Sequence, residues 1–373
     1  MLNKTLFIGP IKDLSGYAAA SRNYIRALIL SGHKENLSLR SVRYDSGNKQ
    51  VLPKELADLH KTKVDTSIHT IVQMLTPNEM RPVDGKRNIA ICCWETDRIP
   101  EHWVSQLNKF DEIIVPCEDN KEAFINSGVK PNITKVPFVF FKDDYVIDNT
   151  NKFIIPGVGP ETVKYYNISQ WSPKKGIDEL IQAYYLAFQN DEDVILVLKG
   201  YINMRNQAGD AQKMLERINQ IRNAMRLPKF PKIYVTDVMM SQSDVLKLHA
   251  SCDIYVNMSK GEGWGIPAYE SLVMGKELIS VEHTGMKEYL TDICNPNPLY
   301  YGLGTGQKRP VYNMGHPDIK LYTSLENWYE PDVLEAAKAF KESYGTLSKR
   351  NVGRDWIIDP VKIGNQLVEI ING

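Results

Sequence analysis

The most informative stretch of the chain is Gly261-Glu262-Gly263-Trp264-Gly265-Ile266-Pro267-Ala268-Tyr269-Glu270. It follows the apolar run Ile254–Met258 and opens an apolar segment that ends at Gly275, an order that predicts a strand, a tight turn and a helix. Pro267 suits the first helical turn, where its missing N–H costs nothing. The three glycines let the backbone approach a ligand closely, and the N–H groups at a helix start favour an anion. The stretch therefore predicts an anion-binding turn in an α/β domain.

Strands and helices alternate along most of the chain. The sequence predicts further strands at Thr5–Gly9, Ser67–Leu75, Asn88–Cys93, Glu112–Pro116, Lys135–Phe140, Tyr165–Ser169, Val194–Leu198 and Ile233–Thr236. It predicts helices at Tyr17–Ser31, Asn120–Ser127, Gly176–Gln189, Gln212–Met225, Val245–Ala250 and from Val361 onward. This alternation is typical of parallel sheets that are covered by helices on both faces.

A polar segment interrupts the alternation near the middle of the chain. Residues 142–161 contain two prolines and two glycines close together, at 156, 157, 159 and 160, which is typical of a linker. The sequence therefore predicts two α/β domains with a cleft between them. Their expected bounds are 1–148 for the first domain, 149–161 for the linker and 162–355 for the second domain, with a C-terminal helix, 356–373, that crosses back to the first.

The composition of the chain argues against several classes of protein. The 373 residues include 45 basic and 45 acidic side chains, so the formal net charge is zero. This balance argues against binding of nucleic acid or anionic lipid by bulk attraction, although it leaves room for a local basic patch. No apolar run approaches the roughly 18 residues of a membrane helix. The five cysteines show no zinc or redox spacing, so we expect a reduced, cytoplasmic protein.

Two carboxylates of the glycine-rich stretch are candidate ligands for hydroxyl groups. Glu270 lies in the expected first helical turn, where its two oxygens suit the adjacent hydroxyls of a ribose diol. Glu262 lies in the loop and suits the hydroxyls of a second sugar. The alternative is a purely structural turn with an acidic helix start, which is common in α/β proteins.

The chain resembles a known family in this stretch and in several others. Gly261–Glu270 is similar to the E-x7-E element of retaining glycosyltransferases of the GT-B fold, in the large family GT4, the glycosyl transferases group 1. The other matching elements are Ser169–Gly176, Ser271–Lys276, Glu282–Leu290, the Trp-Glu element at Cys93–Pro100 and the C-terminal element Trp328–Asp332. The resemblance covers nearly the whole chain. It implies a GT-B fold, in which two Rossmann-like domains face each other across a cleft.

The resemblance also implies roles for the residues of the glycine-rich stretch. Glu270 would bind the ribose of a nucleotide sugar, and Glu262 the hydroxyls of the transferred sugar. The N–H groups of Gly263, Trp264 and Gly265 would hold sugar and phosphate oxygens.

Two further residues would contact the diphosphate of the donor. Lys175 would neutralise the charge that develops on the leaving diphosphate; the alternative is a solvated lysine beside Lys174. Gly16 would present backbone N–H groups from the first domain, and the alternative is a plain glycine at a helix start.

The chain departs from the family pattern at Gln170. The family usually has an arginine there, which shares the diphosphate with the lysine, whereas glutamine brings no charge. We therefore list Gln170 among the donor-binding residues with a weaker role, and consider Arg22 and Arg205 as substitutes.

On the acceptor side, Trp94 and Glu95 follow the expected strand Asn88–Cys93, in place of the histidine that many relatives carry. They are the candidate acceptor-binding residues. The alternative for Trp94 is that it simply packs at the edge between the two domains, since aromatic side chains bury much area.

The expected reaction is transfer of a hexosyl or pentosyl group from a nucleotide sugar to an acceptor hydroxyl, with retention and by front-face displacement. We expect no cofactor and no metal, because Lys175 and the helix start supply positive potential. Asp191-Glu192-Asp193 fits a D-x-D metal pattern, but we interpret it as a solvated turn.

Two alternatives remain open. One is a nucleotide-sugar-binding or scaffolding subunit with little turnover, which Gln170 motivates. The other is a phosphorylase of the same fold with a pyridoxal cofactor. The donor base and sugar stay open, and so do five classes of acceptor: glycans, lipid carriers, small molecules, proteins and modified nucleic-acid bases.

Overall fold

The computed structural model describes residues 3–43, 51–62, 64, 67–146, 152–188, 192–202, 209–293, 300–311, 322–347 and 358–373. The chain divides into two compact units. The first comprises Met1–Phe141, Leu321–Glu326 and Ile357–Gly373, and the second comprises Lys142–Lys320 and Asn327–Trp356.

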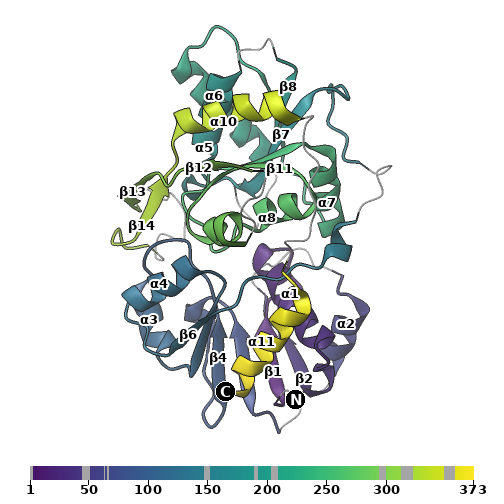
Figure 1. Cartoon of the computed structure of the whole chain (residues 1–373), viewed down its shortest axis with the longest axis vertical. Coiled ribbons are helices and arrows are strands. Elements are labelled where there is room, and N and C mark those ends of the chain that lie inside the picture. The colour runs from purple at the N-terminus through teal and green to yellow at the C-terminus, as the bar shows by residue number, and fades with distance from the viewer. Residues whose placement is uncertain are drawn as a thin grey trace. The chain divides into compact units, whose positions relative to one another are not determined.

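The first unit is built on one six-stranded sheet, whose order is β2-β1-β3-β4-β5-β6 and whose strands are all parallel (Figure 1). The strands are β1 Thr5–Gly9, β2 Leu37–Ser41, β3 Thr70–Met74, β4 Arg87–Ile91, β5 Glu112–Val115 and β6 Asn132–Lys135. The helices are α1 Gly16–Leu30, α2 Lys54–Lys61, α3 Glu101–Leu107, α4 Glu118–Asn126 and α11 Pro360–Asn372. Every residue of β3 and β5 is buried, as expected where helices cover both faces of a parallel sheet.

The predicted strand Lys135–Phe140 is wrong in its extent. β6 ends at Lys135, and Pro137 follows, which has no N–H to continue the ladder. The chain instead runs along α1, where Asn23 Nδ2 donates to the carbonyl of Val139 and Tyr24 Oη donates to the carbonyl of Val136 at 2.5 Å. The N–H of Val136 still donates to the carbonyl of Val115 in β5 at 2.9 Å, whereas side chains of α1 satisfy the carbonyls of Val136 and Val139.

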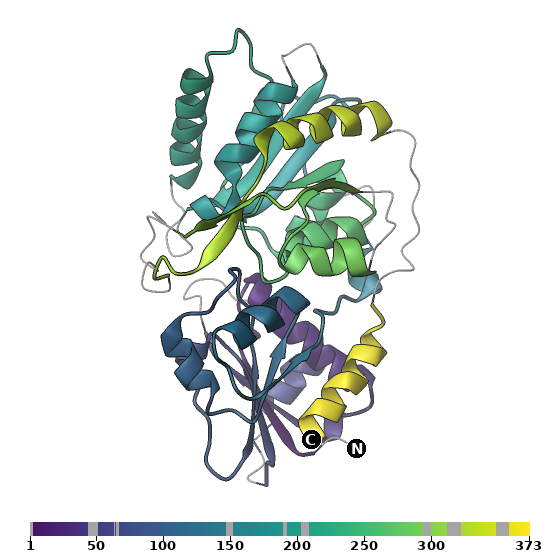
Figure 2. The same ribbon diagram turned by 60° about the vertical axis from the view of Figure 1, so that its left-hand side comes forward.

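The second unit repeats the architecture with a sheet of order β12-β11-β10-β7-β8-β9, again all parallel. Its strands are β7 Val163–Gln170, β8 Val194–Tyr201, β9 Lys232–Thr236, β10 Ile254–Asn257, β11 Glu277–Val281 and β12 Tyr300–Leu303. The helices are α5 Ile177–Ala187, α6 Asp210–Met225, α7 Gln242–Ser251, α8 Ile266–Val273, α9 Gly285–Lys287 and α10 Val333–Thr346. A hairpin of β13 Gln307–Pro310 and β14 Asn327–Glu330 is separate from this sheet. α10 crosses α5, as Figure 2 shows.

The C-terminal helix α11 belongs to the first unit, where it lies along α1 in both views (Figures 1 and 2). Four apolar side chains of α11 are buried: Ile363, Leu367, Val368 and Ile371. Gly364 allows the close approach, because a Cβ there would lie 2.3 Å from the carbonyl oxygen of Ala27. The first unit also includes Tyr322, in a segment that the sequence analysis assigned to the second domain.

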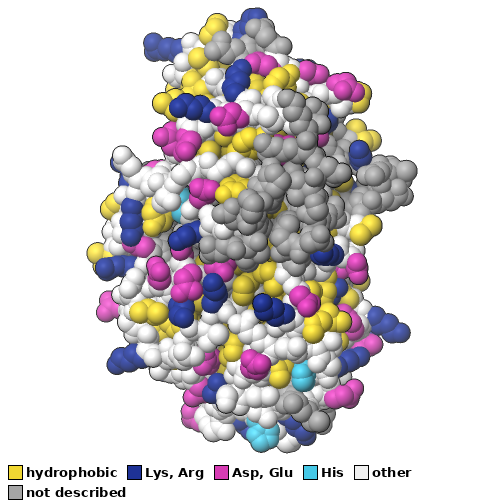
Figure 3. Space-filling model, in the orientation of Figure 1, with side chains coloured by type: hydrophobic (Ala, Val, Ile, Leu, Met, Phe, Trp, Pro, Cys, Tyr) yellow, Lys and Arg dark blue, Asp and Glu magenta, His cyan; other side chains and the backbone are white. Residues whose placement is uncertain are grey.

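The surface mixes charges of both signs. On the face that Figure 3 shows, Lys and Arg side chains are interspersed with Asp and Glu side chains, which agrees with the net charge of zero. Within the described residues, no helix has both the length and the apolar character needed to cross a membrane.

Candidate functional site

The sheet topology of the second unit marks one place for a ligand. From β7 the chain adds β8 and β9 on one side, whereas β10, β11 and β12 follow on the other. The strand order thus reverses between β7 and β10. In open parallel sheets, ligands bind outside the carboxyl ends of the strands at such a reversal. The loops after β7 and β10 are therefore the expected walls of a site.

These two loops are joined backbone to backbone. The loop after β7 contains a 3₁₀ turn, Pro173–Lys175, which ends at Gly176 with φ of +61°. A Cβ at Gly176 would lie 2.0 Å from the carbonyl oxygen of Met258, so only glycine fits. The N–H of Lys260 donates to the carbonyl of Lys174 at 2.8 Å. These contacts fix Lys175 beside the glycine-rich stretch.

Lys175 and Glu262, which the sequence proposed separately, form an ion pair through Nζ and Oε1. Both side chains are 17% exposed. Ser259 Oγ also donates to Glu262 Oε1, at 2.7 Å. Burial raises the pKa of Glu262, but the charges of Lys175 and Lys174 and these hydrogen bonds outweigh burial and hold the pKa below its ordinary value. Glu262 is therefore ionised at neutral pH.

The loop after β11 holds the backbone of Glu262 at both ends. Thr284 Oγ1 accepts a hydrogen bond from the N–H of Glu262 at 3.0 Å, and the N–H of Gly285 donates to the carbonyl of Glu262 at 3.0 Å. Thr284 has φ of +51° and ψ of −139°, a strained conformation for a residue with a side chain. A Cβ at Gly285 would lie 2.5 Å from Gly263 O. The loop after β11 thus fixes the position of the glycine-rich stretch through backbone contacts with Glu262 and Gly263.

The glycine-rich stretch leads into α8 as predicted. Gly265 caps the helix with φ of +78°, and Pro267 lies in its first turn. The Trp264 ring is 2% exposed and packs between Tyr269 and Tyr289, at centroid distances of 5.7 and 5.4 Å. The Trp264 side chain therefore anchors the loop, and only its backbone suits ligand binding. The predicted roles of the N–H groups of Gly263, Trp264 and Gly265 stay predictions.

Glu270 is only 4% exposed and already accepts hydrogen bonds. Its Oε1 accepts from Tyr145 Oη at 3.1 Å and from Gln242 Nε2 at 3.0 Å. His249 Nε2 lies 3.7 Å from Glu270 Oε2, and His249 Nδ1 shares a hydrogen bond with Tyr166 Oη. A ribose diol therefore has to share or replace the donors at Oε1. The role of Glu270 in ribose binding stays a prediction.

Several residues around these carboxylates had no predicted role, although His283 lies within the family-like element Glu282–Leu290. His283, two residues after the end of β11, is 2% exposed, and its ring centroid lies 4.8 Å from that of Tyr329. Burial lowers its pKa to about 4, with a smaller opposing effect of the Glu262 charge. Lys260 is buried between Glu179 and Glu330, at 2.9 and 2.6 Å. The contacts of Tyr145 and Gln242 likewise follow only from the fold.

The structure gives partners to two of the proposed phosphate ligands. Gln170 Nε2 donates to the carbonyl of Ile202 at 3.2 Å. Arg22, in the first unit, donates from Nη1 to the carbonyls of Ile11 and Asp13, at 3.0 and 2.9 Å, so it shapes the loop after β1. Arg205 lies outside the described residues.

Gly16 is the first residue of α1 and is exposed. The capping residue Ser15 accepts from the N–H of Ala18 through its side chain, at 3.2 Å. α1 begins after β1, where the strand order of the first sheet also reverses. This placement suits an anion at the N–H groups of Gly16, and its role stays a prediction.

Trp94 and Glu95 differ in their surroundings. Trp94 is 5% exposed and packs in a hydrophobic cluster between Trp103 and Tyr322, at 4.6 and 5.3 Å. The Trp94 side chain therefore packs within the first unit, and its role in acceptor binding stays a prediction. Glu95 is partly exposed and accepts a hydrogen bond from Tyr322 Oη. Glu95 stays the acceptor-side candidate.

No cluster of three or more His, Cys, Asp or Glu side chains suited to a metal ion occurs in the described part of the chain. In the D-x-D segment, Asp191 lies outside the described residues. Glu192 pairs with Lys341, and Asp193 Oδ1 accepts from Thr162 Oγ1 at 2.9 Å. Metal independence stays a prediction.

Solved structures share the whole architecture. HepE of Anabaena, solved in complex with UDP and glucose, is 14% identical, with 100% of each chain covered and a TM-score of 0.56. A glycosyltransferase of Rickettsia africae is also 14% identical, with 99% of this chain and 93% of that chain covered and a TM-score of 0.56. Sucrose-phosphate synthase of Thermosynechococcus elongatus is 12% identical, with 99% and 95% covered and a TM-score of 0.59. Together with the two parallel sheets, this likeness confirms the predicted GT-B fold.

Sequence comparison is more local. No curated protein matches the chain. The sequence model of one family does match, over residues 148–294, which include Gln170, Lys175 and the whole glycine-rich stretch. That family is described as the glycosyl transferases group 1.

Proposed function

We propose that the chain is a retaining glycosyltransferase, which moves a sugar from a nucleoside diphosphate sugar to an acceptor hydroxyl without a metal. The observation that carries the proposal is the Lys175–Glu262 ion pair, at the strand reversal and inside the family-matched segment. A cation for a diphosphate and an ionised carboxylate for sugar hydroxyls stand side by side there.

The donor base is proposed from the structural neighbours. HepE was solved in complexes that contain UDP and UDP-glucose. At 14–15% identity this likeness shows the fold alone, so UDP-glucose is the first donor to test rather than an assignment.

The proposed reaction is a front-face displacement. The bond between the anomeric carbon and the diphosphate oxygen breaks, and the acceptor oxygen bonds the same face of that carbon. The acceptor proton passes to an oxygen of the leaving diphosphate. Lys175 stabilises the charge that grows on this leaving group. Glu262, which is ionised, accepts hydrogen bonds from the sugar and thereby orients it.

The rival proposal is a donor-binding subunit with little turnover. Gln170 favours it, because its amide already donates to Ile202 O and carries no charge for the diphosphate. Binding without turnover would identify this rival.

A turnover assay separates the two proposals. Release of nucleoside diphosphate is measured with UDP-, GDP- and ADP-sugars and a panel of acceptors, with and without a chelator. Lys175→Met and Glu262→Gln are compared with Lys341→Met. Lys341 lies on the surface of α10, and this change removes its ion pair with Glu192, which precedes β8. We expect turnover in the parent and in Lys341→Met, little in the two site variants, and no effect of the chelator. If the parent binds a nucleotide sugar but releases no nucleoside diphosphate with any acceptor, the proposal of a glycosyltransferase is refuted.

A further inference from the structure

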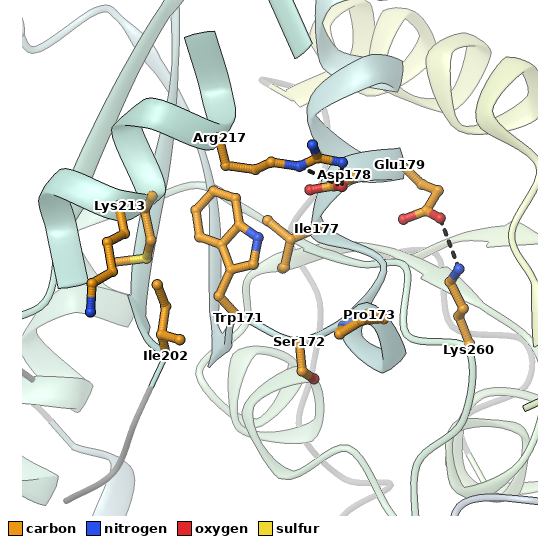
Figure 4. Close-up of a pocket in the computed structure, with 11 residues that line it drawn as sticks. Trp171, Ser172, Pro173, Ile177, Asp178, Glu179, Ile202, Lys213, Arg217 and Lys260 are labelled. Atoms are coloured by element: carbon orange, nitrogen blue, oxygen red, sulfur yellow. Dashed lines mark hydrogen bonds and ion pairs between the residues drawn. The ribbon is translucent and has the colours of Figure 1, made fainter. Parts of the chain in front are cut away.

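A pocket lies beside the candidate site, within the second unit. Its volume is about 400 Å³, within the range of roughly 300–1,000 Å³ that is common for ligand pockets. The loops after β7, β8 and β10, the start of α5 and helix α6 supply its walls (Figure 4). None of the residues proposed above for the donor lines it. This pocket, called the Trp171 pocket below, therefore has no assigned role.

Trp171 lies at the centre of the lining side chains in Figure 4. It is partly exposed, and within the described residues its indole has no aromatic, cationic or hydrogen-bonding partner. Ile177, Ile202 and Met214 add apolar surface. A large aromatic ring that is partly exposed in a pocket and makes no ring contact offers a surface to the apolar face of a ligand.

The polar walls carry both signs of charge in fixed pairs. Arg217 donates to Asp178 Oδ2 from Nη2 at 2.6 Å and from Nε at 3.0 Å. Lys260 Nζ lies 2.9 Å from Glu179 Oε1. Lys213, the other charged lining residue, lies 3.6 Å from Asp210 Oδ1. Because each of these charges has a partner of opposite sign, the walls favour neither a strong anion nor a strong cation. Hydroxyl groups both donate and accept, so they suit such walls.

We propose that the Trp171 pocket binds a neutral saccharide, as a second sugar site separate from the donor site. The C–H face of a sugar ring lies on the partly exposed indole, and the sugar hydroxyls bond the paired carboxylates and the guanidinium. A ligand with an apolar face and a hydroxyl-rich rim matches the pocket on both counts. The proposal goes beyond the transfer reaction and does not depend on it.

The pocket and the donor site share one loop. Lys175 faces Glu262, whereas Trp171 and Ser172 line the pocket. Lys260 links the two, because its N–H bonds Lys174 O and its ammonium pairs with Glu179 at the pocket wall. A bound saccharide is therefore held close to the diphosphate loop without occupying the donor site.

Binding of oligosaccharides by the full chain tests the proposal. The probes are maltotetraose, cellotetraose, chitotetraose and mannotetraose, measured by saturation-transfer NMR and by indole fluorescence in the absence of nucleotide. Three variants are compared. Trp171→Phe keeps an aromatic face, Trp171→Leu keeps only apolar volume, and Leu215→Ala alters α6 at an exposed side chain outside the pocket. Thermal unfolding shows whether each variant is folded.

We expect at least one probe to bind with a dissociation constant on the order of 1 mM or tighter. Trp171→Phe and Leu215→Ala should bind it within about threefold of the parent, and Trp171→Leu should lose at least about tenfold. Neither UDP nor Glu262→Gln should alter the binding, even if the chain proves to transfer no sugar. No binding of any probe, equal binding by Trp171→Leu, or displacement by UDP would overturn the proposal.

Discussion

The two carboxylates of the candidate site have different surroundings, and these predict different roles. Glu262 pairs with a lysine and is partly exposed, whereas Glu270 is buried under the uncharged donors Tyr145 and Gln242. Glu262 therefore suits the transferred sugar, which arrives and leaves in each reaction. Glu270 suits a neutral diol whose hydroxyls donate to the carboxylate in place of Tyr145 and Gln242.

Replacing Glu270 with Gln should weaken nucleoside diphosphate binding. The amide keeps an acceptor for Tyr145 and Gln242, but a ribose diol loses its charged acceptor, at a cost of about 1.5–3 kcal/mol. Calorimetric titration with UDP should show a dissociation constant raised by about 10- to 150-fold. Glu216→Gln, on the exposed side of α6, is the control. Equal affinities for Glu270→Gln and the parent would remove Glu270 from the site.

His283 should make stability depend on pH. Its pKa is about 4 in the fold, compared with 6.5 ordinarily. Between these values the unfolded chain binds a proton that the folded chain does not, so stability falls as the pH drops from 6.5 towards 4, by about 3 kcal/mol in all. His283→Phe keeps a ring on Tyr329 and should flatten this part of the profile in urea unfolding. Identical pH profiles for parent and variant would contradict the prediction.

Among helices and strands, the sequence predicts best where periodicity and turn residues agree. β1 is found at the predicted residues, and α6 and α11 begin within two residues of their predicted starts. Val136–Phe140 has the composition of a strand, yet beyond the bond from Val136 N to β5 its carbonyls bond side chains of α1, which only tertiary contacts reveal. α10 and the β13–β14 hairpin were not predicted.

The close packing of the loop after β7 against the backbone of Met258, just after β10, should depend on Gly176. Gly176→Ala combines an unfavourable φ with overlap on Met258 O, so it should cost more than about 3 kcal/mol and displace Lys175. Gly157→Ala is the matched control, because its φ is +69° and nothing lies near its Cβ position; it should cost about 1 kcal/mol. Urea unfolding compares the two. Similar losses of unfolding free energy in the two variants would show that the packing of Gly176 on Met258 does not constrain the site.

The C-terminal helix should be essential to the first unit. Deleting Val361–Gly373 removes the four buried apolar side chains of α11 and exposes the α1 surface that they cover, with a loss of about 6–12 kcal/mol. That loss is comparable to the total stability of a domain. Hydrogen exchange should show lost protection in β1 and β3 and retained protection in β7 and β8. Unchanged protection in the first unit would contradict this prediction.

Across the whole chain, the sequence motifs identified the residues of the site but not their contacts. Lys175 and Glu262 were proposed separately, because residues so distant in sequence meet only once β7 and β10 are neighbours. Lys260, His283 and Thr284 escaped prediction for the same reason, since their roles follow from burial and from bonds to the glycine-rich stretch. The family match covers residues 148–294. It therefore gives no support to the acceptor-binding candidates Trp94 and Glu95, which lie outside these residues.

The central claim is that Lys175, beside Glu262, holds the diphosphate of a nucleotide sugar. The most direct test is calorimetric titration of the parent, Lys175→Met and Lys341→Met with UDP, GDP and ADP. For at least one nucleotide, the account predicts binding by the parent and by Lys341→Met with similar affinity. Lys175→Met should bind that nucleotide at least about tenfold more weakly, because it loses a charge-assisted bond to the diphosphate. Equal affinities of all three proteins, or no binding of any nucleotide by the parent, would contradict the claim.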